Sequence, residues 1–134
     1  MWQCRLLLTP KFLLLVVFVF LVAALTSCTH TPRVSAEELI REYEHNPYQA
    51  DLKYRDKHIV VEGKILTLGL RSDNVPFVVL DPGPSEYYYG VLCEFPYSER
   101  RRVAKLQEGQ IVTLGGTVEG GGNIFVIITD CKLK

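Results

Sequence analysis

Three consecutive tyrosines could bind a ligand by stacking, because aromatic rings stack on nucleic-acid bases and on sugar rings. The stretch YYYGVLCEF alternates as a strand does. Two of the tyrosines therefore share a face with Val91, Cys93 and Phe95, and we expect them to fill the core. At most the middle tyrosine, or whichever pair faces outward, is then free for a ligand. The candidates are Tyr87, Tyr88 and Tyr89.

A basic run further along the chain could bind phosphate in a nucleic acid or a lipid headgroup, since clustered guanidinium groups match phosphate geometry. The simpler interpretation is a solvent-exposed helix on which Glu99 pairs with Arg102, three residues later. The candidates are Arg100, Arg101, Arg102 and Lys105.

No pattern in the sequence predicts catalysis. The glycine-rich stretch GGTVEGGG lacks both the strand–loop–helix context and the following Lys-Ser/Thr of a phosphate-binding loop. The histidines are not spaced as metal ligands, and the carboxylates show no acid–base pairing; these residues are His30, His45, His58, Asp81, Glu94 and Asp130. We expect a protein that is not an enzyme, with no catalytic residue, cofactor or metal.

The N-terminal segment has the pattern of a secretory signal. Arg5 and Lys11 precede the uninterrupted apolar run from Phe12 to Leu25. That run is shorter than the roughly 20 residues of a membrane-spanning helix and suits the core of a signal peptide. The residues LTSC that follow resemble the lipobox of bacterial lipoproteins, in which the cysteine is acylated after cleavage. We predict a signal peptide over 1–27 and lipidation of Cys28; the alternative is an uncleaved anchor.

The charge after cleavage argues against nucleic acid as the partner. Both basic residues of the signal are lost from a total of 15, whereas all 15 acidic residues follow Cys28. The mature chain would therefore carry a formal charge of −2, whereas a nucleic-acid-binding domain is usually basic. Residues 28–134 suffice for one small domain.

Two further cysteines, Cys93 and Cys131, follow the signal. Export would place them in a compartment that permits disulfides. A bridge between them would stabilise the fold by roughly 3 to 4 kcal/mol on the chain-entropy model. The alternative is two separate buried thiols.

The remaining chain predicts one domain, residues 35–134, behind a tether of residues 28–34. Ser35 and Glu38 form a capping box before a helix that ends at Asn46-Pro47. Alternation predicts strands over 57–67, 76–80, 87–95 and two more within 110–133, and a short helix over 98–106. We therefore expect an all-β fold with short helices, a five-stranded Greek-key barrel of the OB-fold type preceded by an N-terminal helix. A sequential meander is the alternative.

Four stretches resemble the tRNA_anti-like family of bacterial OB-fold lipoproteins: NPYQADLKYRDKHIVVEGKI, GVLCEF, LQEGQIVTLGGTVEG and TDCKL. The resemblance runs from about Ser35 to Leu133, with Asp56 at a position where a glycine is expected. It implies that the third and fifth strands are neighbours, which favours a Cys93–Cys131 bridge. The resemblance carries over no catalytic residue, and it does not imply that the protein binds RNA.

Together these features predict a lipid-anchored binding module of the bacterial envelope, with an envelope protein or a glycan as possible partner. The alternative is nucleic-acid or oligosaccharide binding on the barrel face, which a salt titration would test. An envelope hydrolase is a third hypothesis, based on location alone. Thr29 after Cys28 carries no acidic retention signal, so the outer membrane is expected if the cell has two membranes.

Overall fold

The computed structural model describes residues 10–23 and 30–134. They belong to two compact units, Met1–His30 and Thr31–Lys134, which are considered separately. In the first unit, α1 spans Pro10–Ala23. None of the helices within 10–23 and 30–134 is long and apolar enough to cross a membrane. Cys28 and the end of the predicted signal lie outside the described residues, so lipidation stays a prediction.

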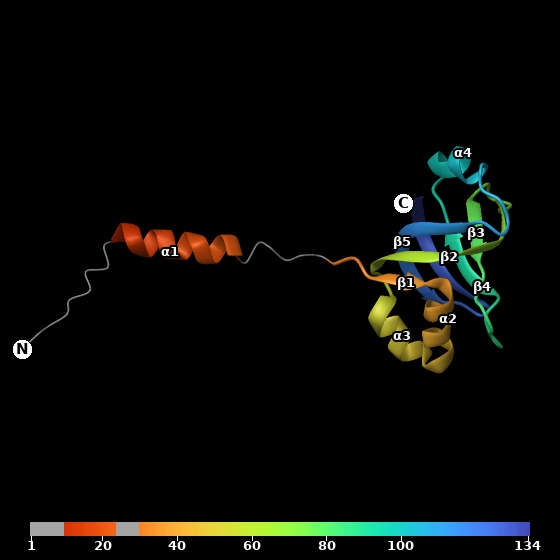
Figure 1. Ribbon diagram of the computed structural model, residues 1–134, viewed down its shortest axis with the longest axis horizontal. Coiled ribbons are helices and arrows are strands. Elements are labelled where there is room, and N and C mark those ends of the chain that lie inside the picture. Colours follow the sequence, from red (N-terminus) through yellow and green to blue (C-terminus); the bar gives the residue numbers. More distant parts are fainter. Residues whose placement is uncertain (1–9, 24–29) are drawn as a thin grey trace, which may run out of the picture. The chain divides into compact units, whose positions relative to one another are not determined.

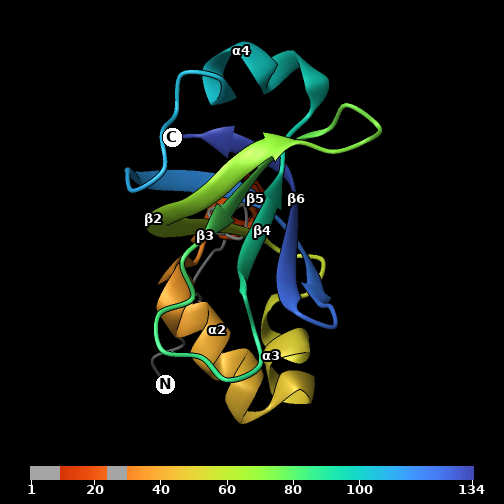
Figure 2. The same cartoon turned by 90° about the vertical axis from the view of Figure 1, so that its right-hand side faces the viewer.

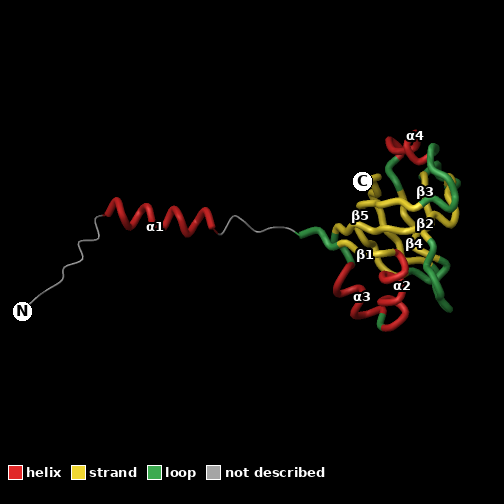
Figure 3. Tube along the Cα trace, in the orientation of Figure 1, coloured by secondary structure: helices red, strands yellow, loops and turns green. Residues whose placement is uncertain are grey.

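The second unit is a closed barrel of five strands (Figures 1 and 3). Its strands are β2 (His58–Leu70), β3 (Pro76–Leu80), β4 (Gly90–Glu94), β5 (Ile111–Gly121) and β6 (Phe125–Leu133). The sheet order β2-β3-β4-β6-β5 closes through pairing of β2 with β5. Because β4 and β6 pair in parallel, the order is that of an OB-fold, and the sequential meander is excluded.

Strand β2 is long enough to pair with a different strand along each of its two halves, which closes the barrel. Its first half, from His58 to Lys64, pairs with β5, and its second half, from Ile65 to Leu70, pairs with β3. A register shift between Ile65 and Thr67 marks the change of partner. Just before β2, Asp56 adopts a left-handed φ of 61°, a conformation that aspartate tolerates. The aspartate therefore keeps the turn that the family pattern assigns to glycine.

Two helices cover one end of the barrel (Figure 2). Helix α2 (Ala36–His45) is capped by Ser35, whose Oγ accepts a hydrogen bond from the Glu38 amide, as predicted. Asn46 ends it and caps α3 (Pro47–Tyr54), in which Pro47 occupies the first turn without needing its missing N–H. The apolar face of α2 packs into the core, because Leu39, Ile40 and Tyr43 are at most 1% exposed.

Three elements differ from the sequence prediction. Arg33 and Val34, expected in the tether, form β1 (Arg33–Ser35), which pairs in parallel with β2. The helix expected over 98–106 is shorter, a 3-10 turn η1 (Tyr97–Glu99) followed by α4 (Arg100–Val103). The strand expected over 87–95 begins only at Gly90. Because these segments are short, their conformation is decided by contacts with neighbouring elements more than by the spacing of their own apolar residues.

The core fills the barrel and continues under α2 and α3. Gly63 of β2 allows the start of α2 to pack closely, since a Cβ there would lie 2.9 Å from the Cβ of Ala36. Gly116 of β5 similarly lies where a Cβ would come within 2.6 Å of Ile128. The absence of a side chain at these two positions thus lets neighbouring elements pack closely against the strands.

Candidate ligand-binding face

The outer surface of the barrel carries an unusual row of apolar side chains. An exposed sheet face is ordinarily polar. On β3, β4 and β6, however, the side chains that point outward are largely apolar. Val79 is buried, and four others are half-buried: Phe77, Leu92, Phe125 and Ile127. Strand register places Val79 opposite Leu92, and Leu92 beside Ile127. The row is therefore continuous across three strands, and we call it the outer face.

A hollow of about 470 Å³ lies at one end of the outer face. Its lining residues are Leu66, Thr67, Val79, Tyr89, Ile124 and Phe125. The rings of Tyr89 and Phe125 lie 6.4 Å apart at an interplanar angle of 49°. Tyr89 is 66% exposed, and its backbone N–H donates to the carbonyl of Ile124 (2.8 Å). The backbone therefore holds an exposed aromatic ring at the edge of an apolar depression.

A carboxylate from α2 holds the loop that carries the tyrosines. Oε1 of Glu44 accepts hydrogen bonds from the Ser85 hydroxyl and from the amides of Glu86 (3.1 Å) and Tyr87 (3.3 Å). The Ser85 hydroxyl in turn accepts from the Tyr88 amide (3.0 Å). The hydrogen bond from Ser85 is the main cause of a lowered pKa of Glu44; burial opposes it, and the hydrogen bonds from the Tyr87 and Glu86 amides lower the pKa further.

The structure reverses the predicted orientation of the tyrosines. Tyr87 and Tyr89, expected in the core, are exposed, whereas Tyr88 packs against the core and meets the Tyr43 ring edge-on. The cause is Gly90, whose φ of +152° interrupts the alternation between the tyrosines and Val91. A Cβ at Gly90 would lie 2.4 Å from the carbonyl oxygen of Leu80. A glycine directly after the tyrosines was the signal for this change of face.

The basic run lies at the opposite end of the barrel from the tyrosine loop (Figure 2). The predicted pair of Glu99 and Arg102 is confirmed at 3.2 Å. Arg100 lies over the Tyr97 ring, 4.1 Å from its centroid, while Arg101 and Lys105 are exposed. The two groups of candidate residues therefore do not form one site.

The outer face offers little free positive charge. Arg71, which follows β2, forms ion pairs with Asp73 (3.2 Å) and with Glu94 of β4. Its guanidinium is thereby neutralised beside the face. A phosphate backbone needs unpaired cations for affinity, so the electrostatics favour an uncharged ligand surface.

The two core cysteines lie within the barrel. Cys93 and Cys131 are both fully buried and present as free thiols. Interaction with the Cys131 side chain, and then burial, raises the pKa of the Cys93 thiol well above its ordinary value. The neighbouring positions of β4 and β6 agree with the strand order that the family resemblance implied; the disulfide itself stays a prediction.

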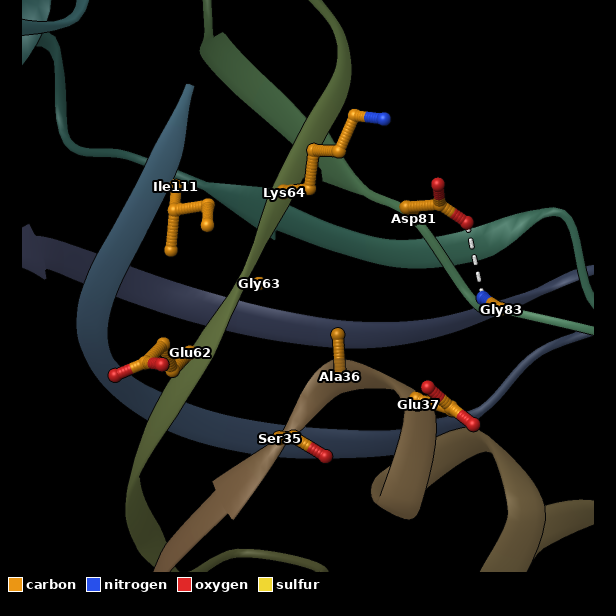
Figure 4. A pocket seen from close by; sticks show the side chains of 9 residues that line it. All are labelled: Ser35, Ala36, Glu37, Glu62, Gly63, Lys64, Asp81, Gly83 and Ile111. Atoms are coloured by element: carbon orange, nitrogen blue, oxygen red, sulfur yellow. Dashed lines mark hydrogen bonds between the residues drawn. The ribbon is translucent and has the colours of Figure 1, made fainter. Parts of the chain in front are cut away.

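A second, more polar hollow of about 300 Å³ lies between the start of α2 and β2 (Figure 4). Oδ1 of Asp81 accepts from the Gly83 amide (2.9 Å), and the Glu37 side chain lies over Gly83. Glu62 and Lys64 complete its charged lining. Within residues 10–23 and 30–134, no cluster of three His, Cys, Asp or Glu side chains could hold a metal ion. The hydrogen bond from Gly83 to Asp81 stabilises the turn that follows β3.

Comparison with known proteins agrees with this architecture. The family model tRNA_anti-like matches residues 6–132. A candidate nucleic acid-binding lipoprotein of Klebsiella pneumoniae superimposes with a TM-score of 0.64 at 17% identity, covering 86% of this chain and 96% of that one. A candidate aspartyl-tRNA synthetase of Leishmania major gives 0.50 at 11% identity, covering 87% of this chain and 25% of that one. No curated protein matches.

Proposed function

Since this chain belongs to the tRNA_anti-like family, we propose that it is a non-catalytic binding module whose site is the outer face. One observation carries the proposal: an apolar hollow opens on the outside of the barrel, beside two aromatic rings. Apolar surface exposed in this way gains free energy when a ligand removes it from water. The site lies where OB-folds bind ligands, along the strands next to the loop between the last two strands.

The chemistry of the hollow favours an envelope protein segment or a glycan. Leu66, Ile124 and Phe125 offer apolar contact, while the hydroxyl of Tyr89 adds a polar group on a rigid ring. Both kinds of ligand present uncharged surface, which suits the neutralised Arg71.

Nucleic acid is the second candidate. Its bases would stack on Tyr89 and Phe125, and the similar Klebsiella protein is named as a candidate nucleic acid-binding lipoprotein. It is less favoured here, because Arg71, the cation beside the outer face, is already paired with Asp73 and Glu94.

Titration of the isotope-labelled protein with single-stranded oligothymidine and with oligomers of N-acetylglucosamine tests the site. We expect ligand-induced NMR shifts around the hollow, lost in a Tyr89→Ala/Phe125→Ala variant and kept in Tyr97→Ala, an exposed tyrosine at the other end. If a ligand binds the double variant as tightly as the unaltered protein, its site is not the outer-face hollow. Oligothymidine binding that weakens steeply between low and moderate salt would establish the nucleic-acid alternative.

We further propose that the module is held in the envelope by lipid on Cys28, after removal of residues 1–27, with residues 28–34 as its tether. Several acyl chains on one N-terminus anchor a protein where a single chain would not. The support is the lipobox pattern and the lipoprotein name of the similar Klebsiella protein. If the cell has two membranes, Thr29 favours the outer one.

Intact mass of the protein from its native membrane tests both the anchor and the bridge. We expect the mass of residues 28–134 plus a diacylglyceryl group, with no alkylation of Cys93 or Cys131 before reduction. A full-length mass would refute cleavage, and alkylation under denaturing conditions without reductant would refute the disulfide.

A further inference from the structure

A hollow of about 400 Å³ lies at the α4 end of the barrel, between α4 and the turn that joins β2 to β3. Its lining is mainly apolar and includes Leu68, Leu70, Pro76, Val103 and Ala104. Leu70 and Tyr97 are 62% and 59% exposed. This α4 hollow is separate from the outer face, and its lining offers contact to an apolar chain.

Cations without acidic partners stand around the α4 hollow. Arg100 and Arg101 line it, and Lys105 lies two residues beyond the end of α4. In the described parts of the chain, none of the three forms an ion pair, whereas Arg102 is paired with Glu99. Glu108 is the next carboxylate along the chain and is exposed. The guanidinium of Arg100 is oriented by the Tyr97 ring and by donation to the Tyr97 carbonyl (3.1 Å).

The combination selects for a ligand that is both apolar and anionic. Guanidinium groups suit phosphate oxygens, and an apolar hollow beside them suits a hydrocarbon chain. A free phosphate would leave the hollow hydrated, and a neutral lipid would leave the cations unpaired. We propose that the α4 hollow binds an anionic phospholipid of the membrane, with its phosphate on Arg100 and Arg101 and the start of an acyl chain against Leu70.

The proposed anchor would supply such lipids at high local concentration. Only a few residues separate Cys28 from Arg33, the start of β1, and an extended chain of this length reaches about 17 Å. A domain tethered so closely meets the membrane surface repeatedly. This step rests on the proposed anchor, whereas the α4 hollow itself does not.

Native mass spectrometry of the full chain in neutral detergent tests the proposal, with dioleoyl phosphatidylglycerol and dioleoyl phosphatidylcholine as probes. We expect preferential binding of phosphatidylglycerol, with roughly a fivefold contribution from each cation. An Arg100→Gln/Arg101→Gln/Lys105→Gln variant should lose the preference. The control variant Arg41→Gln/Lys57→Gln/Lys64→Gln removes the same charge from exposed positions on α2, just before β2 and on β2, and should keep it.

Two further measurements separate the phosphate from the chain. Leu70→Ser should weaken binding of both lipids without changing the preference, and excess glycerol phosphate should not displace phosphatidylglycerol. Equal binding of the two lipids by the unaltered chain would overturn the proposal. So would loss of preference in both triple variants, unaltered binding by Leu70→Ser, or full displacement by glycerol phosphate. Loss of outer-face binding in Tyr89→Ala/Phe125→Ala leaves this proposal unaffected.

Discussion

At one end of the barrel, α2 and α3 bury six side chains, whereas at the other end η1 and α4 bury only Val103. The first end is also joined by polar contacts, from Tyr43 to Asp51 and from Glu44 to the tyrosine loop. The second end presents an open hollow and unpaired cations. From this difference we expect the α2–α3 end to contribute more to the stability of the fold than the α4 end does. The α4 end instead leaves apolar and cationic side chains accessible to a ligand.

The largest effect should come from the core under α2. Leu39→Ala removes a fully buried side chain and should lower the free energy of unfolding by about 2 to 5 kcal/mol. Leu70→Ala, at the mouth of the α4 hollow, should change it by less than about 0.5 kcal/mol. Urea unfolding followed by circular dichroism measures both. Similar losses would abolish the distinction between the ends.

A smaller effect should follow loss of one hydroxyl. The Tyr43 hydroxyl donates to Oδ1 of Asp51 (3.0 Å), and Tyr43→Phe should cost about 1 to 2 kcal/mol of stability. Tyr97→Phe is the matched control, because that side chain is exposed at the α4 end. Thermal unfolding of the two variants in parallel would show the contrast, and a loss in Tyr97→Phe as large as in Tyr43→Phe would contradict it.

A still smaller difference between the two ends should come from the coupling energies of their exposed ion pairs. Lys53 contacts both carboxylate oxygens of Glu42 at 2.9 Å, and Tyr54 also donates to that carboxylate. Arg102 and Glu99 have a single contact of 3.2 Å. Double-mutant cycles should give couplings below about 1 kcal/mol for both pairs, larger for Lys53–Glu42. The reverse order would indicate that the α4 end is the better organised.

The subtlest effect should be a local pH dependence at the tyrosine loop. Because hydrogen bonds lower the pKa of Glu44, its contribution to stability is present above the ordinary glutamate pKa of about 4.3. That contribution is lost as the pH falls through the lowered pKa of the folded state. The protection factors of the Glu86 and Tyr87 amides, which are exchange rates corrected for the pH dependence of intrinsic exchange, should therefore fall on acidification. Glu44→Gln should remove this dependence; an unchanged profile would exclude Glu44 as its source.

The barrel could be predicted from the sequence, because its long strands bury every second side chain and therefore show an alternation of apolar and polar residues. It also identified the cap at Ser35 and the Glu99–Arg102 pair, which are local in the chain. It failed at Tyr87–Tyr89, where Gly90 shifts the face by a close approach to Leu80. The outer-face hollow and the α4 hollow escaped prediction, since each joins residues from segments distant in the sequence. Contacts of that kind depend on the closed barrel rather than on any local pattern.

If the chain is exported as we propose, the strand order has a consequence for when it folds. β6 pairs with both β4 and β5, so the barrel cannot close until Phe125–Leu133 is available. Non-local pairing of this kind also slows folding. A chain that crosses a membrane with its N-terminus leading would thus stay open until its final strand emerges, and it would fold only after translocation is complete.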